Sequence, residues 1–102
     1  MQHHELIGKT LVFEYTSDTY RIEVLSNARL HWTQLRGDTP GKGDDEDYVY
    51  SLLSEDLGLI TWIEADGLGL SNVLNFAEAT VTTHANMGRT VYLNPGKLSI
   101  ED

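Results

Sequence analysis

The sequence contains no cysteine, so no disulfide can stabilise the fold and no thiolate can act as a nucleophile or bind a soft metal. Small secreted domains often depend on disulfides, and their absence here favours a reducing, cytoplasmic location. The first residues carry neither a basic segment nor an apolar run, which argues against a signal peptide. No apolar stretch approaches the roughly 20 residues that cross a bilayer. We therefore expect a soluble protein with no membrane partner.

Positive charge is also scarce. The 7 Lys and Arg residues stand against 16 Asp and Glu residues, which gives a formal net charge of −9. Nucleic acids and anionic membranes bind mainly through basic groups that displace counterions, so both are poor partners for this chain. The 102 residues leave room for one domain with one modest core, and 40% hydrophobic residues are enough to form it.

Helical periodicity is nearly absent from the sequence. Apolar residues instead recur at every second position, which is typical of strands. This alternation predicts strands over residues 11–16, 20–24, 29–33, 48–52, 59–64, 70–76, 80–84 and 90–93. Regularly spaced turns indicate a sandwich or a barrel, and closure removes the exposed edges of an open sheet. We predict a single all-β domain over residues 1–102, an antiparallel meander barrel of about eight strands, with room inside for side chains or one small ligand.

Three segments are predicted to lie outside the barrel wall. Residues 36–47 combine three glycines, a proline and a run of acids, so we expect a flexible acidic loop. Its acids lack the alternating oxygen spacing of a calcium loop, which favours a solvated segment. Residues 1–5 and 97–102 are predicted to be tails or an extra short strand.

Strand alternation also predicts which side chains point into the barrel. On the fifth predicted strand two registers are open, because either Ile60 and Trp62 or Leu59 and Ile63 can face inward. If Trp62 faces inward, Glu64 does so too. On the first four strands the inward rows are Leu11, Phe13 and Tyr15; Tyr20, Ile22 and Val24; Leu30 and Trp32; and Tyr48, Tyr50 and Leu52.

Aromatic side chains on these rows are candidates for a ligand pocket, since pockets are mostly apolar with a few polar anchors. An ordinary aromatic core is the alternative. If Glu64 faces inward, desolvation raises its pKa and suits it to acid or base chemistry, and the Tyr15 hydroxyl can anchor a ligand oxygen. A rim carboxylate beside a core tyrosine is the alternative. The predicted ligand-binding residues are Phe13, Tyr15, Trp32, Tyr48, Tyr50, Trp62 and Glu64, with Tyr92 as a further aromatic.

The four histidines do not form a metal motif. His3 and His4 are adjacent in a predicted tail, and neighbours on an extended chain point apart. His31 is expected on the outer face beside Arg29, and His84 lies near a turn. We expect neither a metal site nor a cofactor.

A family resemblance rests on short motifs. Leu6-Ile7-Gly8-Lys9 precedes an aromatic strand, and the segment 61–67 (TWIEADG) is followed by Ser71 and by Asn75-Phe76. These motifs resemble the MoaF-like and phenolic acid decarboxylase families, both small lipocalin-like (calycin) barrels, over residues 6–93. The resemblance to MoaF-like proteins implies no settled reaction.

The resemblance to the decarboxylases implies a specific pocket. There, two tyrosines on the first strand and an arginine hold the substrate carboxylate, and a glutamate handles the proton at the phenol end. Tyr15 and Glu64 match this pattern, but Phe13 stands at the first tyrosine position and Gly41, beside Lys42, at the arginine position. Half of the catalytic set is therefore missing.

The residue patterns and the resemblance leave three candidate functions. The first is a barrel that binds a small aromatic or apolar molecule without turnover, with residues 36–47 as a lid. The second is a lyase related to the decarboxylases, with Glu64 as proton donor or acceptor and Tyr15 as anchor. The third is a homodimer that forms through an outer apolar face including Leu59 and Ile63. The missing tyrosine and arginine favour the binding barrel.

Overall fold

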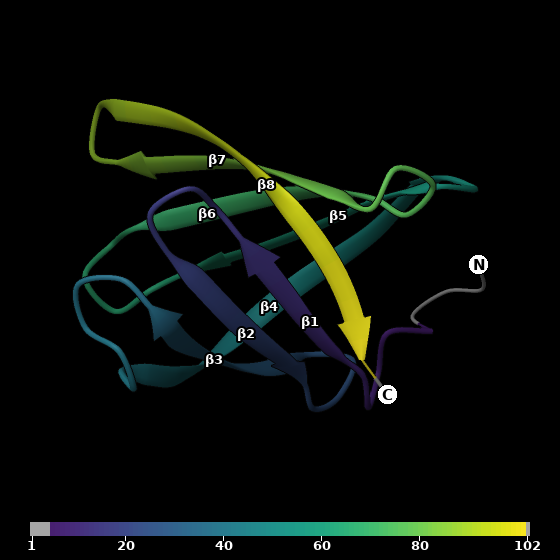
Figure 1. Ribbon diagram of the computed structural model, residues 1–102, viewed down its shortest axis with the longest axis horizontal. Coiled ribbons are helices and arrows are strands. Elements are labelled where there is room, and N and C mark those ends of the chain that lie inside the picture. Colours follow the sequence, from purple (N-terminus) through teal and green to yellow (C-terminus); the bar gives the residue numbers. More distant parts are fainter. Residues whose placement is uncertain (1–4, 102) are drawn as a thin grey trace.

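The computed structural model describes residues 5–101 and contains no helix in that range. Each strand pairs antiparallel with the next, and the last strand returns to the first, so the sheet closes into a barrel (Figure 1). The predicted all-β meander barrel is confirmed. Its strands are β1 (Thr10–Glu14), β2 (Thr19–Val24), β3 (Arg29–Arg36), β4 (Gly43–Ser54), β5 (Leu57–Ile63), β6 (Gly69–Asn75), β7 (Thr80–Met87) and β8 (Thr90–Glu101).

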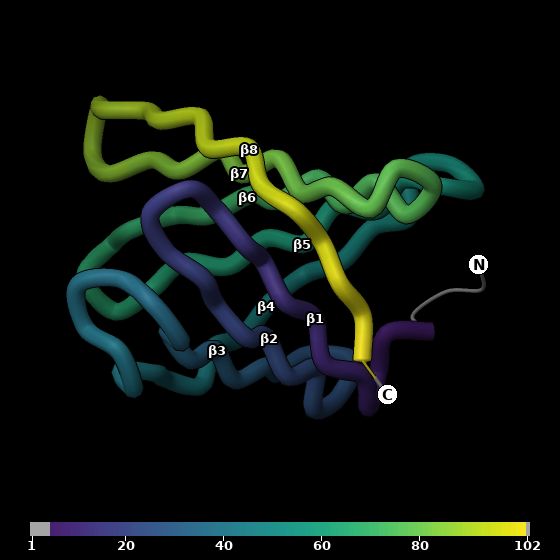
Figure 2. The backbone as a smooth tube through the Cα atoms, viewed as in Figure 1, coloured from purple at the N-terminus to yellow at the C-terminus, as the bar shows by residue number. Residues whose placement is uncertain are grey.

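The connections alternate between the two ends of the barrel, because each joins neighbouring antiparallel strands (Figure 2). The turns β1–β2, β3–β4, β5–β6 and β7–β8 gather at one end. The predicted Asp66-Gly67 turn lies there, and Gly67 adopts a φ of 93°, which a side chain would strain. The opposite end is plugged by the chain before β1, where Leu6 is fully buried. One end is therefore closed and the other is free for a site.

Strand β4 is longer than predicted. Residues Gly43–Asp47 pair with Arg29–Thr33 of β3, and the rest of β4 pairs with β5. The predicted flexible loop over residues 36–47 is therefore wrong for Arg36, which ends β3, and for residues 43–47, and the connection between the strands is 37–42.

The acids of β4 alternate between the two faces of the sheet, and on each face they contact side chains of β3. On the outer face Asp45 lies 2.7 Å from Nδ1 of His31, and Asp47 lies 2.7 Å from Nη1 of Arg29. On the inner side Glu46 is 8% exposed and accepts a 3.0 Å hydrogen bond from Nε1 of Trp32. Ion pairs and hydrogen bonds between side chains on neighbouring strands stabilise a sheet, so this acidic run forms a strand.

Strand β8 is also longer than predicted, and it closes the barrel. Its residues 97–101 pair with β1, and Leu98 is buried in the core, so of the two alternatives predicted for this segment the strand is observed and the tail is wrong. Pro95-Gly96 lies inside the strand rather than in a turn. A Cβ at Gly96 would lie 2.8 Å from the carbonyl oxygen of Glu14, so glycine permits this close approach. The predicted N-terminal tail falls almost entirely on residues 1–4, which lie outside the described residues, as does residue 102.

The inward rows predicted for the first three strands are confirmed. Leu11, Phe13, Ile22 and Leu30 are each at most 2% exposed. On β5 the register that turns Ile60 and Trp62 inward is the observed one, and Ile63 is 67% exposed on the outer face.

Candidate functional site

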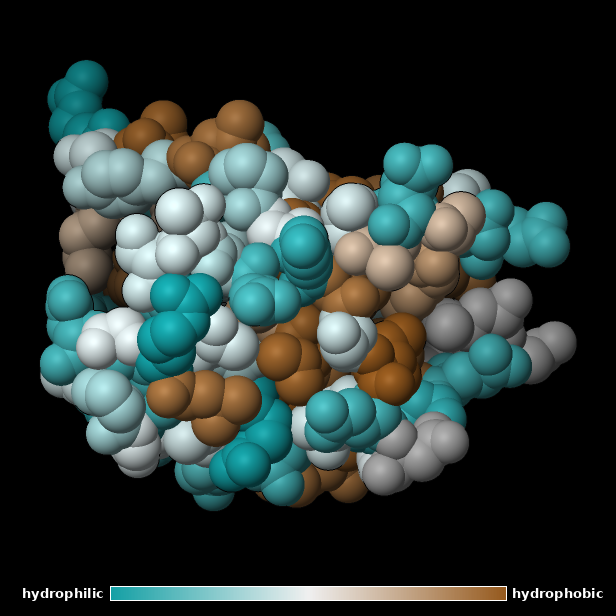
Figure 3. Space-filling view, in the orientation of Figure 1, coloured by the Kyte–Doolittle hydropathy of each residue, from teal (hydrophilic) through white to brown (hydrophobic). Residues whose placement is uncertain are grey.

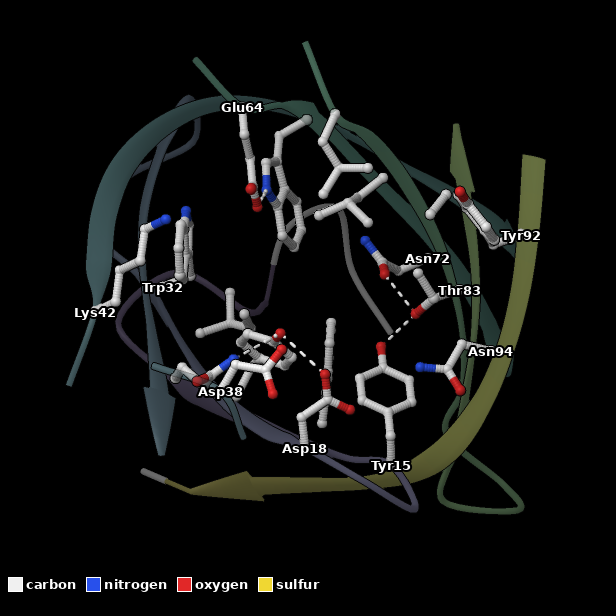
Figure 4. Close-up of a pocket in the computed structure, with 18 of the residues that line it drawn as sticks. Tyr15, Asp18, Trp32, Asp38, Lys42, Glu64, Asn72, Thr83, Tyr92 and Asn94 are labelled. Atoms are coloured by element: carbon white, nitrogen blue, oxygen red, sulfur yellow. Dashed lines mark hydrogen bonds between the residues drawn. The ribbon is translucent and has the colours of Figure 1, made fainter. Parts of the chain in front are cut away.

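The free end of the barrel contains a cavity of about 880 Å³. Its wall comes from the inward rows of β1, β2, β3, β5, β6 and β7, and its rim from three turns and from the first half of β8 (Figure 4). Known small-molecule pockets span roughly 300–1,000 Å³, so the cavity has the size of a ligand site.

Most of the predicted pocket residues line this cavity. They are Phe13, Tyr15, Trp32, Trp62 and Glu64, and Tyr92 lies at the rim. The prediction is wrong for the two tyrosines of β4, because alternation gives the face of a side chain but not its depth along the barrel. Tyr48 donates its hydroxyl hydrogen to the Ser26 carbonyl at the closed end, and the Tyr50 ring packs over Gly58.

Glu64 faces the cavity just beyond the end of β5. Its Oε2 accepts a 3.3 Å hydrogen bond from Nε1 of Trp62, which extends from the same wall. Burial raises the pKa of Glu64, with smaller contributions from the negative charges of Glu46 and Asp66. Figure 4 places Glu64 and Tyr15 on opposite sides of the cavity. The two predicted catalytic residues therefore face the same space from different walls.

Tyr15 begins a hydrogen-bond chain whose direction follows from its last member. Nδ2 of Asn72 donates to the Ile60 carbonyl, which can only accept, so Oδ1 of Asn72 must accept from the Thr83 hydroxyl. The Thr83 oxygen then accepts from the Tyr15 hydroxyl. Burial raises the pKa of Tyr15 to about 12. Tyr15 therefore offers the cavity an acceptor oxygen and keeps its proton at neutral pH.

A second chain of hydrogen bonds crosses the rim, and its donor–acceptor direction follows from the same kind of argument. The backbone N–H of Thr39 donates to Oε1 of Gln34, so Nε2 of Gln34 donates to the Tyr20 hydroxyl at 3.0 Å. Tyr20 in turn donates to Oδ2 of Asp18 at 3.1 Å. Burial raises the pKa of Tyr20 as well. The chain also ties the 37–42 connection to β3, so this part of the predicted lid is bound to the barrel.

Sequence reasoning missed the polar residues inside the wall. Asn72 is 1% exposed and Thr83 is 5% exposed, and both line the cavity. The signal was available in the alternation, because Asn72 lies between Leu70 and Leu74 on a row that points inward. A polar residue on an apolar inward row requires a partner, and such partners often belong to sites.

The described residues hold no cluster of three or more His, Cys, Asp or Glu side chains arranged to bind a metal ion. Within residues 5–101 no helix is long and apolar enough to cross a bilayer.

A family model described as MoaF-like matches residues 7–99. The chain belongs to the MoaF-like family. Among solved structures, this MoaF-like chain is similar to a Burkholderia vietnamiensis protein provisionally described as a beta-lactamase. The two are 20% identical over 98% of this chain and 99% of the other, with a TM-score of 0.88, which shows a shared fold alone. Comparison with curated proteins finds no match for this chain.

Apolar side chains also lie on the outer surface. Figure 3 shows apolar atoms over the β7–β8 hairpin at the upper left, where Val91 is 77% and Leu93 64% exposed. On the face predicted to form a homodimer, Ile63 is largely exposed and Leu59 is half-buried. The homodimer stays a prediction. A solution mass near twice 11.4 kDa would support it, and a mass of 11.4 kDa at micromolar concentration would contradict it.

Proposed function

We propose that this MoaF-like protein binds a small molecule inside its barrel and acts in the cytoplasm. The observation that carries the proposal is the cavity itself, which two indole rings line and which Glu64 and the Tyr15 oxygen face. Apolar walls with a few oriented polar groups are the usual composition of a small-molecule site. The absence of cysteine is compatible with a reducing compartment.

The test uses a neutral aromatic dye, N-phenyl-1-naphthylamine, whose fluorescence rises in apolar surroundings. We expect saturable binding by the parent protein, together with a change in the emission of the two tryptophans, because both line the cavity. Ala85 also lines the cavity, so Ala85→Trp should fill part of it and weaken dye binding. Ala28→Trp is the matched control, because Ala28 is exposed in the β2–β3 turn. Equal dye binding by the two variants, or none by the parent, would contradict the proposal.

A lyase is the second candidate, and one observation favours it. Glu64 faces the cavity with a raised pKa, which suits proton transfer. The means of holding a substrate carboxylate are weaker, because Phe13 has no hydroxyl and Tyr15 donates its hydrogen to Thr83. We expect no release of carbon dioxide from 4-hydroxycinnamate, a phenolic acid. Turnover that Glu64→Gln abolishes without loss of folding would establish the lyase instead.

A further inference from the structure

We propose that the cavity selects a protonated amine on an apolar or aromatic body and disfavours a carboxylate of the same shape. The inference rests on the proposed function and names the class of ligand. It follows from three properties of the lining: its charge, the direction of its hydrogen bonds and the position of its indole rings.

The charges around the cavity are predominantly negative. The acidic residues in the lining are Asp18, Asp38, Glu64 and Asp66. Among the described lining residues, Lys42 is the one Lys or Arg side chain. A cation entering this end is attracted, whereas an anion encounters several like charges at short range in a partly desolvated space.

The aromatic hydrogen-bond donors of the wall already have protein acceptors. The Trp32 and Trp62 N–H groups donate to Glu46 and Glu64 respectively. The Tyr15 and Tyr20 hydroxyls donate to other side chains through the two directed chains. A ligand therefore meets mainly oxygen acceptors on these walls, which match the N–H groups of an ammonium better than the oxygens of a carboxylate.

The indole rings supply the remaining contact. Trp32 and Trp62 line the same cavity as Glu64, so a cationic ligand held by the carboxylate shares this space with two indole rings. Trp is the strongest cation–π partner among the side chains, and the interaction grows when the site excludes water. The apolar part of the ligand can then pack against Phe13 and Leu70, which line the same cavity.

The experiment compares three probes that share one apolar body: 4-phenylbutylamine, 4-phenylbutan-1-ol and 5-phenylpentanoate. Calorimetric titration at about pH 8 keeps the amine probe protonated and the carboxylate probe ionised. We expect the amine to bind about tenfold more tightly than the alcohol, and the carboxylate to bind more weakly than the alcohol.

Three variants separate a local effect from the general negative charge of the protein. Glu64→Gln should weaken amine binding about tenfold and leave alcohol binding unchanged. Glu78→Gln makes the same change of charge on an exposed turn at the closed end and should leave both unchanged. Lys42→Gln should not weaken amine binding, because it removes a positive charge from the rim.

The outcomes also distinguish this inference from the proposed function. Alcohol or carboxylate binding as tight as amine binding, or equal effects of the Glu64 and Glu78 variants, would overturn the amine inference alone. Binding of the naphthylamine dye but of none of the three probes would do the same. If neither the dye nor any probe binds the parent, the proposed function fails as well.

Discussion

Which hydrogen-bond donors and acceptors the cavity presents to a ligand depends on a few side chains. Their donor–acceptor direction is fixed by the backbone groups to which they bond. The Ile60 carbonyl can only accept, and this makes Thr83 a donor to Asn72 and Tyr15 a donor to Thr83. A hydroxyl in water can rotate to donate or accept, but the Tyr15 hydroxyl has one orientation that satisfies its neighbours. The pocket is therefore preorganised before any ligand enters.

Thr83→Val tests this chain. Valine has nearly the same shape, but it leaves Oδ1 of Asn72 without its donor and the Tyr15 hydroxyl without its acceptor. Buried groups that lose a partner cost about 1–3 kcal/mol, so we expect the free energy of unfolding to fall by that amount in urea denaturation. Thr82→Val is the control on the outward side of β7 and should change the free energy by less than about 0.5 kcal/mol. Equal effects of the two variants would show that the chain does not stabilise the fold.

The raised pKa of Glu64 makes a prediction about pH. Burial keeps Glu64 protonated to a higher pH in the folded protein than in the unfolded chain. Between those two pKa values the folded state holds more protons, so this residue lowers the free energy of unfolding as pH rises through that window. Glu64→Gln removes the effect, so its stability relative to the parent should increase as pH rises above the ordinary glutamate pKa of about 4.3 and through the raised pKa of the folded protein. Urea denaturation measures this difference. Glu78→Gln corrects for net charge, and an identical pH dependence in both variants would refute the assignment.

At the level of strands, most of the fold could be predicted from alternation and turn residues, and the exceptions have physical causes. The sequence predicts a solvated loop for the acids of β4, because their partners Arg29 and His31 lie on another strand. Composition alone does not reveal such pairing. Pro95-Gly96 reads as a turn, yet both residues lie in a strand where close approach to β1 favours glycine. The position of Tyr48 along the barrel axis could not be predicted either, because alternation predicts only the face of the strand on which a side chain lies.

Amide hydrogen exchange tests the added part of β4. The Tyr48 amide bonds to the Ala28 carbonyl, and antiparallel pairs alternate, so the amides of Glu46 and Asp44 should face β3. We expect slow exchange at these two amides and faster exchange at Asp45. Fast exchange at all three would mean that the segment behaves as the flexible loop that composition predicts.

At the level of the whole molecule, closure depends on one seam. Leu98 is 5% exposed and places the last part of β8 in the core next to β1. Leu98→Ala should lower the free energy of unfolding by about 2–5 kcal/mol, whereas Ser99→Ala, on the outer face of the same seam, should have little effect. A chain that ends after Gly96 should lose cooperative thermal unfolding. If that chain unfolds at the parent's temperature, residues 97–101 are a tail after all.

The seam has a consequence for how the chain can be rearranged. Every other strand pair joins sequence neighbours, so these hairpins can form early, while pairing of β8 with β1 must wait until distant segments meet. Thr10 and Glu101 are partners in this seam, which brings the beginning and end of the barrel wall together. A short linker between them, with new termini at the Gly88 turn, would give a circular permutant in which the last pairing to form becomes a local hairpin.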